Sequence, residues 1–235
     1  MGGGPEGSAS PYHGLLFDFS GVLTTDLFVG YRSLCRDQGL PENALFDFLT
    51  QDDEGHRLLV NVEQGVIGQE EFERGVGRGL GIDGSSLVQR VWSYLRPETK
   101  LLEFIDDVRG RGVRAGVVSN SLGVRPFDPY TLWGIADRFD AVVLSGEVGL
   151  RKPEPEIFLL SLERLGVAAD QCVFIDDMVH NLEAAQVLGL TTVHHTDPDA
   201  TVAALGDLLG LRQSPPSSSE SSLASGRSDS SSPSC

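Results

Sequence analysis

Six side chains suited to acid, base or anion-binding chemistry come at the ends of short apolar runs or shortly after them. They are Asp18, Ser119, Asn120, Lys152, Asp176 and Asp177. Three carboxylates that meet in one place repel one another unless a cation lies among them. A lysine is one such cation, and Mg²⁺ is another, because it prefers carboxylate, carbonyl and water oxygens. We therefore expect a site that holds Mg²⁺ and an anionic group.

Five apolar runs are typical of buried strands and would bring these side chains together. The runs span residues 14–19, 113–119, 140–145, 172–176 and 190–195, with helical patterns at 101–109, 156–165 and 178–188. Strands and helices that alternate at this spacing predict an α/β fold with a doubly wound, mainly parallel Rossmann-like sheet. The carboxyl ends of parallel strands share one edge of such a sheet, so the polar residues should converge on one crevice.

One segment breaks the alternation of strand and helix. It has no strand pattern but shows four amphipathic helical stretches, at 31–38, 42–49, 70–77 and 86–95. This pattern predicts an α-helical cap subdomain at 27–96, inserted into an α/β core formed by 11–26 and 97–212. Since the chain leaves the sheet from the end of its first strand, the cap should lie over the edge that carries the polar residues.

The two ends and the overall charge narrow the class of protein. Residues 1–10 are rich in glycine and residues 213–235 in serine, so we expect both to be disordered. A net charge of −16 without a basic cluster argues against a nucleic acid partner. No apolar run approaches the ~18–20 residues that span a bilayer, and three cysteines far apart in the sequence suit a reducing compartment. We expect a cytoplasmic protein with no membrane partner.

The order of these motifs resembles that of the haloacid dehalogenase superfamily, in the branch with a helical cap after the first strand. The resemblance covers residues 14–211, and its most specific part is GEVGLRKPEPEIF followed by FIDD. It implies that Asp18 is the nucleophile and that Ser119 and Lys152 hold the transferred group. It also implies that Asn120 makes a second polar contact to that group.

The same resemblance implies a set of metal ligands. Asp176 would bind Mg²⁺ directly, together with Asp18 and the backbone carbonyl of Ser20, and Asp177 would support the ion from the outer sphere. An aspartate that attacks phosphorus forms an aspartyl-phosphate, which splits one difficult displacement into two easier ones. The expected function is therefore a Mg²⁺-dependent phosphatase that acts on a small phosphorylated metabolite.

The sequence departs from the phosphatase pattern at Ser20. That position usually carries a second aspartate, which protonates the leaving group, and general acid catalysis is typically worth ~10²–10⁴ in rate. Three interpretations follow. The enzyme acts on esters whose leaving group needs little protonation, or a cap residue supplies the proton. Alternatively, it is a metal-independent 2-haloacid dehalogenase relative, or a non-catalytic protein that binds a phosphorylated ligand.

The cap also contains candidates for substrate contacts. These are Arg57, Arg74, Arg78 and the turn at 63–65, since caps in this family contribute to specificity and exclude water. His194 and His195 close the last predicted strand, but neighbouring side chains on a strand point to opposite faces. We therefore expect at least one of the two histidines to be structural.

Overall fold

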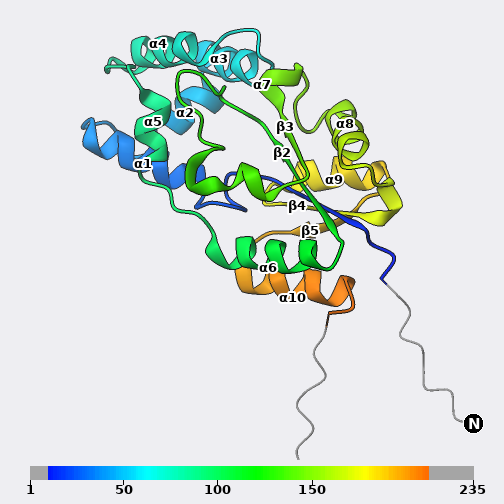
Figure 1. Cartoon of the computed structure of the whole chain (residues 1–235). Coiled ribbons are helices and arrows are strands. Elements are labelled where there is room, and N and C mark those ends of the chain that lie inside the picture. The colour runs from blue at the N-terminus through cyan, green and yellow to red at the C-terminus, as the bar shows by residue number, and fades with distance from the viewer. Residues whose placement is uncertain (1–9, 212–235) are drawn as a thin grey trace, which may run out of the picture.

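The computed structural model describes residues 10–211 and is built on a sheet of five parallel strands (Figure 1). The strands are β1 (Gly14–Phe17), β2 (Arg114–Ser119), β3 (Ala141–Leu144), β4 (Cys172–Asp176) and β5 (Thr191–His194), in the order β3-β2-β1-β4-β5. Each falls within one of the predicted runs, so the predicted fold class is confirmed. The predicted disordered tail at 213–235 lies outside the described residues, as does the predicted lead except for Ser10.

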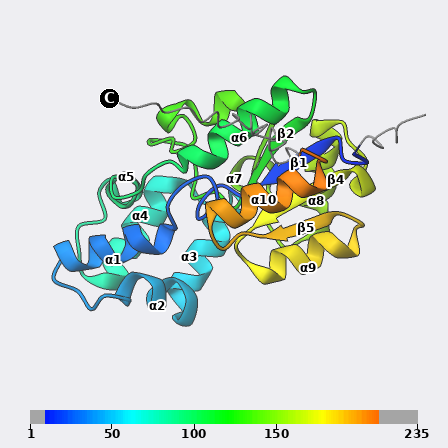
Figure 2. The same cartoon turned by 90° about the horizontal axis from the view of Figure 1, so that it is seen from below.

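Helices cover both faces of the sheet (Figures 1 and 2). One face packs against α6 (Thr99–Gly110) and α10 (Pro198–Leu208), and the other against α8 (Pro155–Leu165) and α9 (Val179–Val187). Leu15 and Phe17 of β1 belong to the apolar cluster on the first face, whereas Leu16 belongs to the cluster on the second. This alternation follows from the two-residue period of a strand, and burial on both faces explains why the strands are apolar throughout.

Five helices lie between β1 and α6 in the sequence. They are α1 (Leu27–Asp37), α2 (Ala44–Gln51), α3 (Asp53–Glu63), α4 (Gln69–Leu80) and α5 (Leu87–Trp92). Figure 1 shows them grouped at one side of the sheet, where α3 contacts the short helix α7 (Ser145–Val148) that follows β3. The helical content of 27–96 is therefore as expected, while the boundaries of a separate cap subdomain stay a prediction.

Three helices were not expected from the sequence: α3, the short helix α7 and α10. The first turn of α3 is polar, and it begins where the Asp52 side chain accepts hydrogen bonds from the backbone of Glu54 and Gly55. Helix α10 begins in the same way, with Asp197 as its N-cap and Pro198 in its first turn. Both are ordinary start signals for a helix. In the described part of the chain, no helix is long and apolar enough to cross a membrane.

Candidate active site

A buried lysine joins two carboxylates at the carboxyl edge of the sheet. Asp18 directly follows β1, Asp176 ends the adjacent strand β4, and Lys152 lies in the loop between α7 and α8. The Lys152 ammonium donates hydrogen bonds to Asp18 Oδ1 and to Asp176 Oδ2, each over 2.6 Å. The Lys152 side chain is only 2% exposed and the Asp176 side chain is fully buried. The three residues predicted to lie together at this edge therefore form one ion-paired cluster.

The third carboxylate, that of Asp177, completes a set of oxygens that fits a hard divalent ion. One oxygen each from Asp18, Asp176 and Asp177 lies within 4.8 Å of the others. Gly21 leaves room for this arrangement: its φ is +90°, and a Cβ at this position would lie 2.8 Å from Asp177 Oδ2. Carboxylate oxygens are the ligands that Mg²⁺ prefers, so the residues present fit the ion. Outer-sphere support of the ion by Asp177 and its ligation by the Ser20 carbonyl remain predictions.

A second layer of polar groups fixes the Asp176 carboxylate. The backbone N–H of Met178 donates to Asp176 Oδ1 over 2.7 Å, and the Asn181 side-chain amide donates to both carboxylate oxygens, over 3.1 and 3.2 Å. The amide oxygen of Asn181 is buried and has no hydrogen-bond partner. An unpaired buried oxygen beside a carboxylate cluster suits a site that also takes a cation or its water.

The predicted phosphate-binding residues Ser119 and Asn120 line the same cavity as Asp18. The Ser119 hydroxyl shares a hydrogen bond of 3.0 Å with the hydroxyl of Tyr130, a buried residue that sequence reasoning missed. The Asn120 amide donates to the Lys152 carbonyl over 3.0 Å, and its oxygen accepts from the Lys152 N–H over 2.8 Å. Because both ends of the Asn120 amide bind the backbone of Lys152, Asn120 positions the lysine.

Burial and mutual repulsion control the charges in this cluster. Burial raises the pKa of Asp18 to about 7; Lys152 opposes this effect, while Asp176 and Asp177 add to it. Burial and Asp176 raise the pKa of Asp177 to about 6. Burial alone would lower the pKa of Lys152, but Asp176 and Asp18 outweigh it and raise that pKa, so the ammonium stays charged. Carboxylates held this close together gain most from an added cation.

The cavity that Asp18 and Lys152 line has a volume of about 290 Å³, and residues of α1, α2 and α3 line it as well. Glu63, at the end of α3, lines it and forms an ion pair of 2.7 Å with Arg151, the residue before the buried lysine. Gln64 donates a weak hydrogen bond of 3.5 Å to Glu154. The turn at 63–65 therefore contacts the core beside the site, with Arg151 as an unforeseen partner, and its contact with the substrate stays a prediction.

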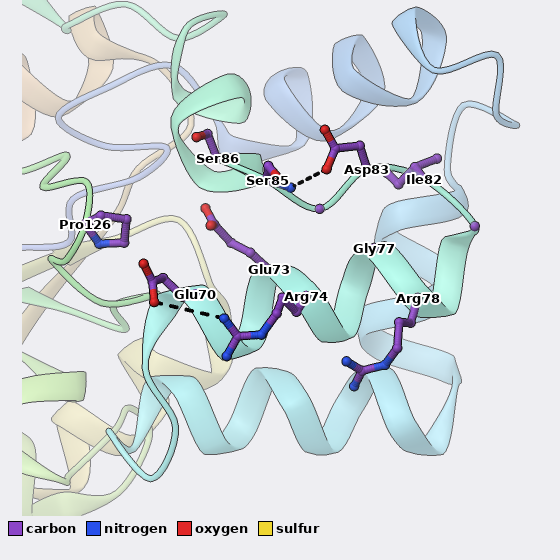
Figure 3. Close-up of a pocket in the computed structure, with 12 residues that line it drawn as sticks. Glu70, Glu73, Arg74, Gly77, Arg78, Ile82, Asp83, Ser85, Ser86 and Pro126 are labelled. Carbon is purple, nitrogen blue, oxygen red and sulfur yellow. Dashed lines mark hydrogen bonds and ion pairs between the residues drawn. The ribbon is translucent and has the colours of Figure 1, made fainter.

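The three arginines of the predicted cap, Arg57, Arg74 and Arg78, do not line the cavity of Asp18. A larger hollow of about 660 Å³, between α4 and the segment leading into α5, is lined by Arg74 and Arg78 (Figure 3). None of the residues that line this hollow also lines the cavity of Asp18. Arg57 is exposed on α3 and is not among the residues lining the Asp18 cavity either. Contact between these three arginines and the substrate therefore stays a prediction.

The two histidines at the end of β5, His194 and His195, lie in different surroundings. His195 is buried and hydrogen-bonded to the Thr201 hydroxyl over 2.8 Å, and burial lowers its pKa. His194 bonds through its ring to the Asp177 carbonyl over 3.1 Å. His195 is therefore structural, because its ring joins β5 to α10.

A parallel sheet with a lysine and carboxylates at its carboxyl edge is the arrangement expected for the haloacid dehalogenase superfamily. Comparison with known proteins agrees with this expectation. The model of the haloacid dehalogenase-like hydrolase family matches residues 12–189. The chain therefore belongs to the haloacid dehalogenase-like hydrolases and is an enzyme of that family. Phosphatases are among its similar relatives.

Three similar proteins illustrate the family. Sesquiterpene phosphatase astK of Aspergillus oryzae is 27% identical over 199 residues, which cover 83% of this chain and 95% of that one. Flavin mononucleotide hydrolase 1 of Arabidopsis thaliana is 26% identical over 215 residues, covering 86% and 79%. A crystal structure of a family enzyme from Bacteroides thetaiotaomicron superposes with a TM-score of 0.61 at 25% identity, covering 79% and 94%.

Proposed function

We propose that the chain is a Mg²⁺-dependent phosphatase that acts on a small phosphorylated molecule through an aspartyl-phosphate on Asp18. The observation that carries the proposal is the buried Lys152 ammonium, 2.6 Å from both Asp18 and Asp176, with Asp177 beside them. A variant of the Bacteroides enzyme was crystallised with magnesium and inorganic phosphate, which supports the same ligands here.

The chemistry follows from the residues present. A carboxylate oxygen of Asp18 attacks phosphorus, the bond from phosphorus to the leaving-group oxygen breaks, and the leaving group departs with its electron pair. Water then attacks the phosphorus of the aspartyl-phosphate and releases phosphate, which restores the Asp18 carboxylate. Lys152 stabilises the charge on the phosphoryl oxygens. Bound Mg²⁺, which Asp18, Asp176 and the Ser20 carbonyl would hold with Asp177 in the outer sphere, would supply further positive charge.

The serine at position 20 limits which leaving groups depart easily. Ser20 lines the cavity beside Asp18, and its hydroxyl does not ionise near neutral pH. We infer that the preferred substrates have leaving groups that need little protonation. Glu63 is the alternative proton donor from the cap, because it lines the same cavity and burial raises its pKa to about 7.

The proposal is tested by phosphate release from acetyl phosphate and p-nitrophenyl phosphate. We expect release to require Mg²⁺ and to be lost in Asp18→Asn. Chloride release from 2-chloropropionate in EDTA, without phosphatase activity, would instead show a dehalogenase. No turnover of any of these substrates, together with no thermal stabilisation by beryllofluoride and Mg²⁺, would indicate a protein without a working phosphoryl site.

A further inference from the structure

The wall of the active-site cavity that faces Asp18 is apolar. Three helices of the inserted segment contribute Leu27, Phe28, Tyr31, Phe46, Leu49 and Leu59 to it, and Thr50 and Glu63 are the polar residues that these helices add to the lining. Its aromatic rings form one cluster, since the ring centroid of Phe28 lies 4.8 Å from that of Phe46 and 6.1 Å from that of Tyr31. Apolar surface of this kind, next to a few placed polar groups, is typical of small-molecule sites.

The charges that line the cavity are unfavourable for a second anion on the substrate. Each of its two permanent cations already has a carboxyl partner, because Arg151 lies 2.7 Å from Glu63 and Lys152 pairs with Asp18 and Asp176. Asp26 and Asp177 line the cavity as well and add negative charge. A carboxylate or second phosphate on the leaving group would therefore meet repulsion, and no permanent cation among the described lining residues is free to bind it.

We propose that the leaving group of the substrate is uncharged and largely apolar, and that it packs against the wall formed by α1, α2 and α3. This inference rests on the proposed phosphatase function and specifies its substrate class. The phosphoryl group would lie at Asp18 and Lys152, at one end of the cavity, and the apolar part of the ester would extend toward the helices. A volume of about 290 Å³ limits the substrate to a small molecule.

Acyl phosphates of increasing length test the inference, because every member has an equally acidic leaving group and needs no proton donor. The series is acetyl, butyryl and hexanoyl phosphate, with succinyl phosphate as the charged match to butyryl phosphate. One buried methylene is worth ~0.8 kcal/mol, or roughly fourfold in kcat/KM. We expect kcat/KM to rise at least about tenfold from acetyl to hexanoyl phosphate and to fall about tenfold from butyryl to succinyl phosphate.

Two neighbouring leucines of α3 provide a matched pair of variants. Leu59 lines the cavity, whereas Leu58 does not and packs instead near Gly75 of α4. We expect Leu59→Ala to lower the ratio of hexanoyl to acetyl phosphate turnover about fivefold or more, and Leu58→Ala to leave that ratio unchanged.

Several results would overturn the inference while leaving the phosphatase proposal standing. In one, acetyl phosphate turnover depends on Asp18 but kcat/KM does not rise with the length of the acyl chain. In another, kcat/KM is higher for succinyl phosphate, or for an acyl phosphate with a trimethylammonium end, than for butyryl phosphate. If neither the acyl phosphates nor p-nitrophenyl phosphate turn over, the phosphatase proposal fails. Calorimetry with ethylphosphonate and hexylphosphonate then tests the apolar wall by itself: the longer compound should bind more tightly, and equal binding would overturn the inference.

Discussion

Lys152 Nζ lies 2.6 Å from Asp18 Oδ1, and the same ammonium is 2.6 Å from Asp176 Oδ2. A single buried cation thus balances the carboxylates at the ends of two adjacent strands. The hydrogen bonds from Asn120 to both backbone groups of Lys152 fix the base of this side chain. The proposed nucleophile, the proposed metal ligand and the cation are consequently held together by contacts from separate elements.

The first prediction concerns that ammonium. Replacing Lys152 by methionine leaves two buried carboxylates without their partner, which typically costs ~3–5 kcal/mol. We expect Lys152→Met to lose phosphatase activity and to lower the free energy of unfolding by about that amount in EDTA. Mg²⁺ should restore part of the lost stability, because it can neutralise the same carboxylates.

Lys100→Met is the matched control for this lysine. Lys100 also pairs with an aspartate, Asp199, but both side chains are more than half exposed. Exposed pairs contribute ~0–1 kcal/mol. Urea unfolding of both variants measures the difference, and equal losses of stability would contradict the view that Lys152 is the central cation of a buried site.

The second prediction concerns the space that Gly21 leaves for Asp177. A Cβ at Gly21 would lie 2.8 Å from Asp177 Oδ2, so Gly21→Ala must displace that carboxylate. We expect about a tenfold or larger loss of Mg²⁺ affinity, because displaced groups around a metal typically cost 10–100-fold. Titration of Mg²⁺ against phosphatase rate or thermal stability measures the affinity.

Gly39→Ala is the control that distinguishes the contact with Asp177 from the cost of placing a Cβ on a residue with positive φ. Gly39 also has a positive φ, +68°, but a Cβ there would meet nothing within 4 Å. Both variants carry the cost of placing a non-glycine residue at positive φ, ~1–3 kcal/mol. If Gly39→Ala weakened Mg²⁺ activation as much as Gly21→Ala does, the role given to Asp177 would be wrong.

The third prediction concerns Ser20. Introducing a carboxylic acid at this position in Ser20→Asp should speed the hydrolysis of phenyl phosphate, whose leaving group gains from protonation, by ~10²-fold. Acetyl phosphate needs no such proton, so its rate should change little. Ser20→Asn has a similar shape without the acid and should show no gain. Equal gains on both substrates would refute the account of the missing acid.

The fourth prediction is a pH dependence of stability that belongs to Glu63. Burial raises the pKa of Glu63 from 4.5 to about 7, against the opposing effects of Arg151 and Lys152. Between these two values the folded protein keeps a proton that the unfolded chain releases. The contribution of Glu63 to stability is therefore present below about pH 4.5 and declines as the pH rises to about 7.

Glu63→Gln removes this titration and keeps the shape of the side chain. We expect the free energy of unfolding of the wild-type protein, measured in EDTA, to fall relative to that of Glu63→Gln as the pH rises through this window. A difference between the two proteins that does not change with pH would show that Glu63 is not held protonated by its burial.

Much of the fold could be predicted because its signals are local. Each buried strand is a short apolar run, and residues such as Asp18 and Asp176 come where those runs end. Helix α3 was missed because its first turn is polar and its apolar residues come late. Its N-cap, Asp52, was nevertheless a readable signal.

The finer geometry of the site could not be predicted because it depends on which faces of distant elements meet. The sequence suggested that Arg74 contacts the substrate, yet this residue of α4 lines a separate hollow that shares no residue with the Asp18 cavity. Conversely, nothing local marks Arg151 as the partner of Glu63, since that pair forms only when α3 packs beside the loop before α8. Tyr130, which bonds to Ser119, escaped notice for the same reason.

The central claim, that Asp18 becomes phosphorylated during turnover, is tested most directly by trapping the acyl phosphate. The protein is quenched in acid while it turns over acetyl phosphate with Mg²⁺, then reduced with borohydride and analysed by peptide mass spectrometry. Borohydride converts an aspartyl-phosphate to the side chain of homoserine. We predict this change at Asp18 in the wild-type protein and its absence in Asp18→Asn, which should also release no phosphate. Phosphate release at the wild-type rate by Asp18→Asn, or turnover without any modification of Asp18, would contradict the account.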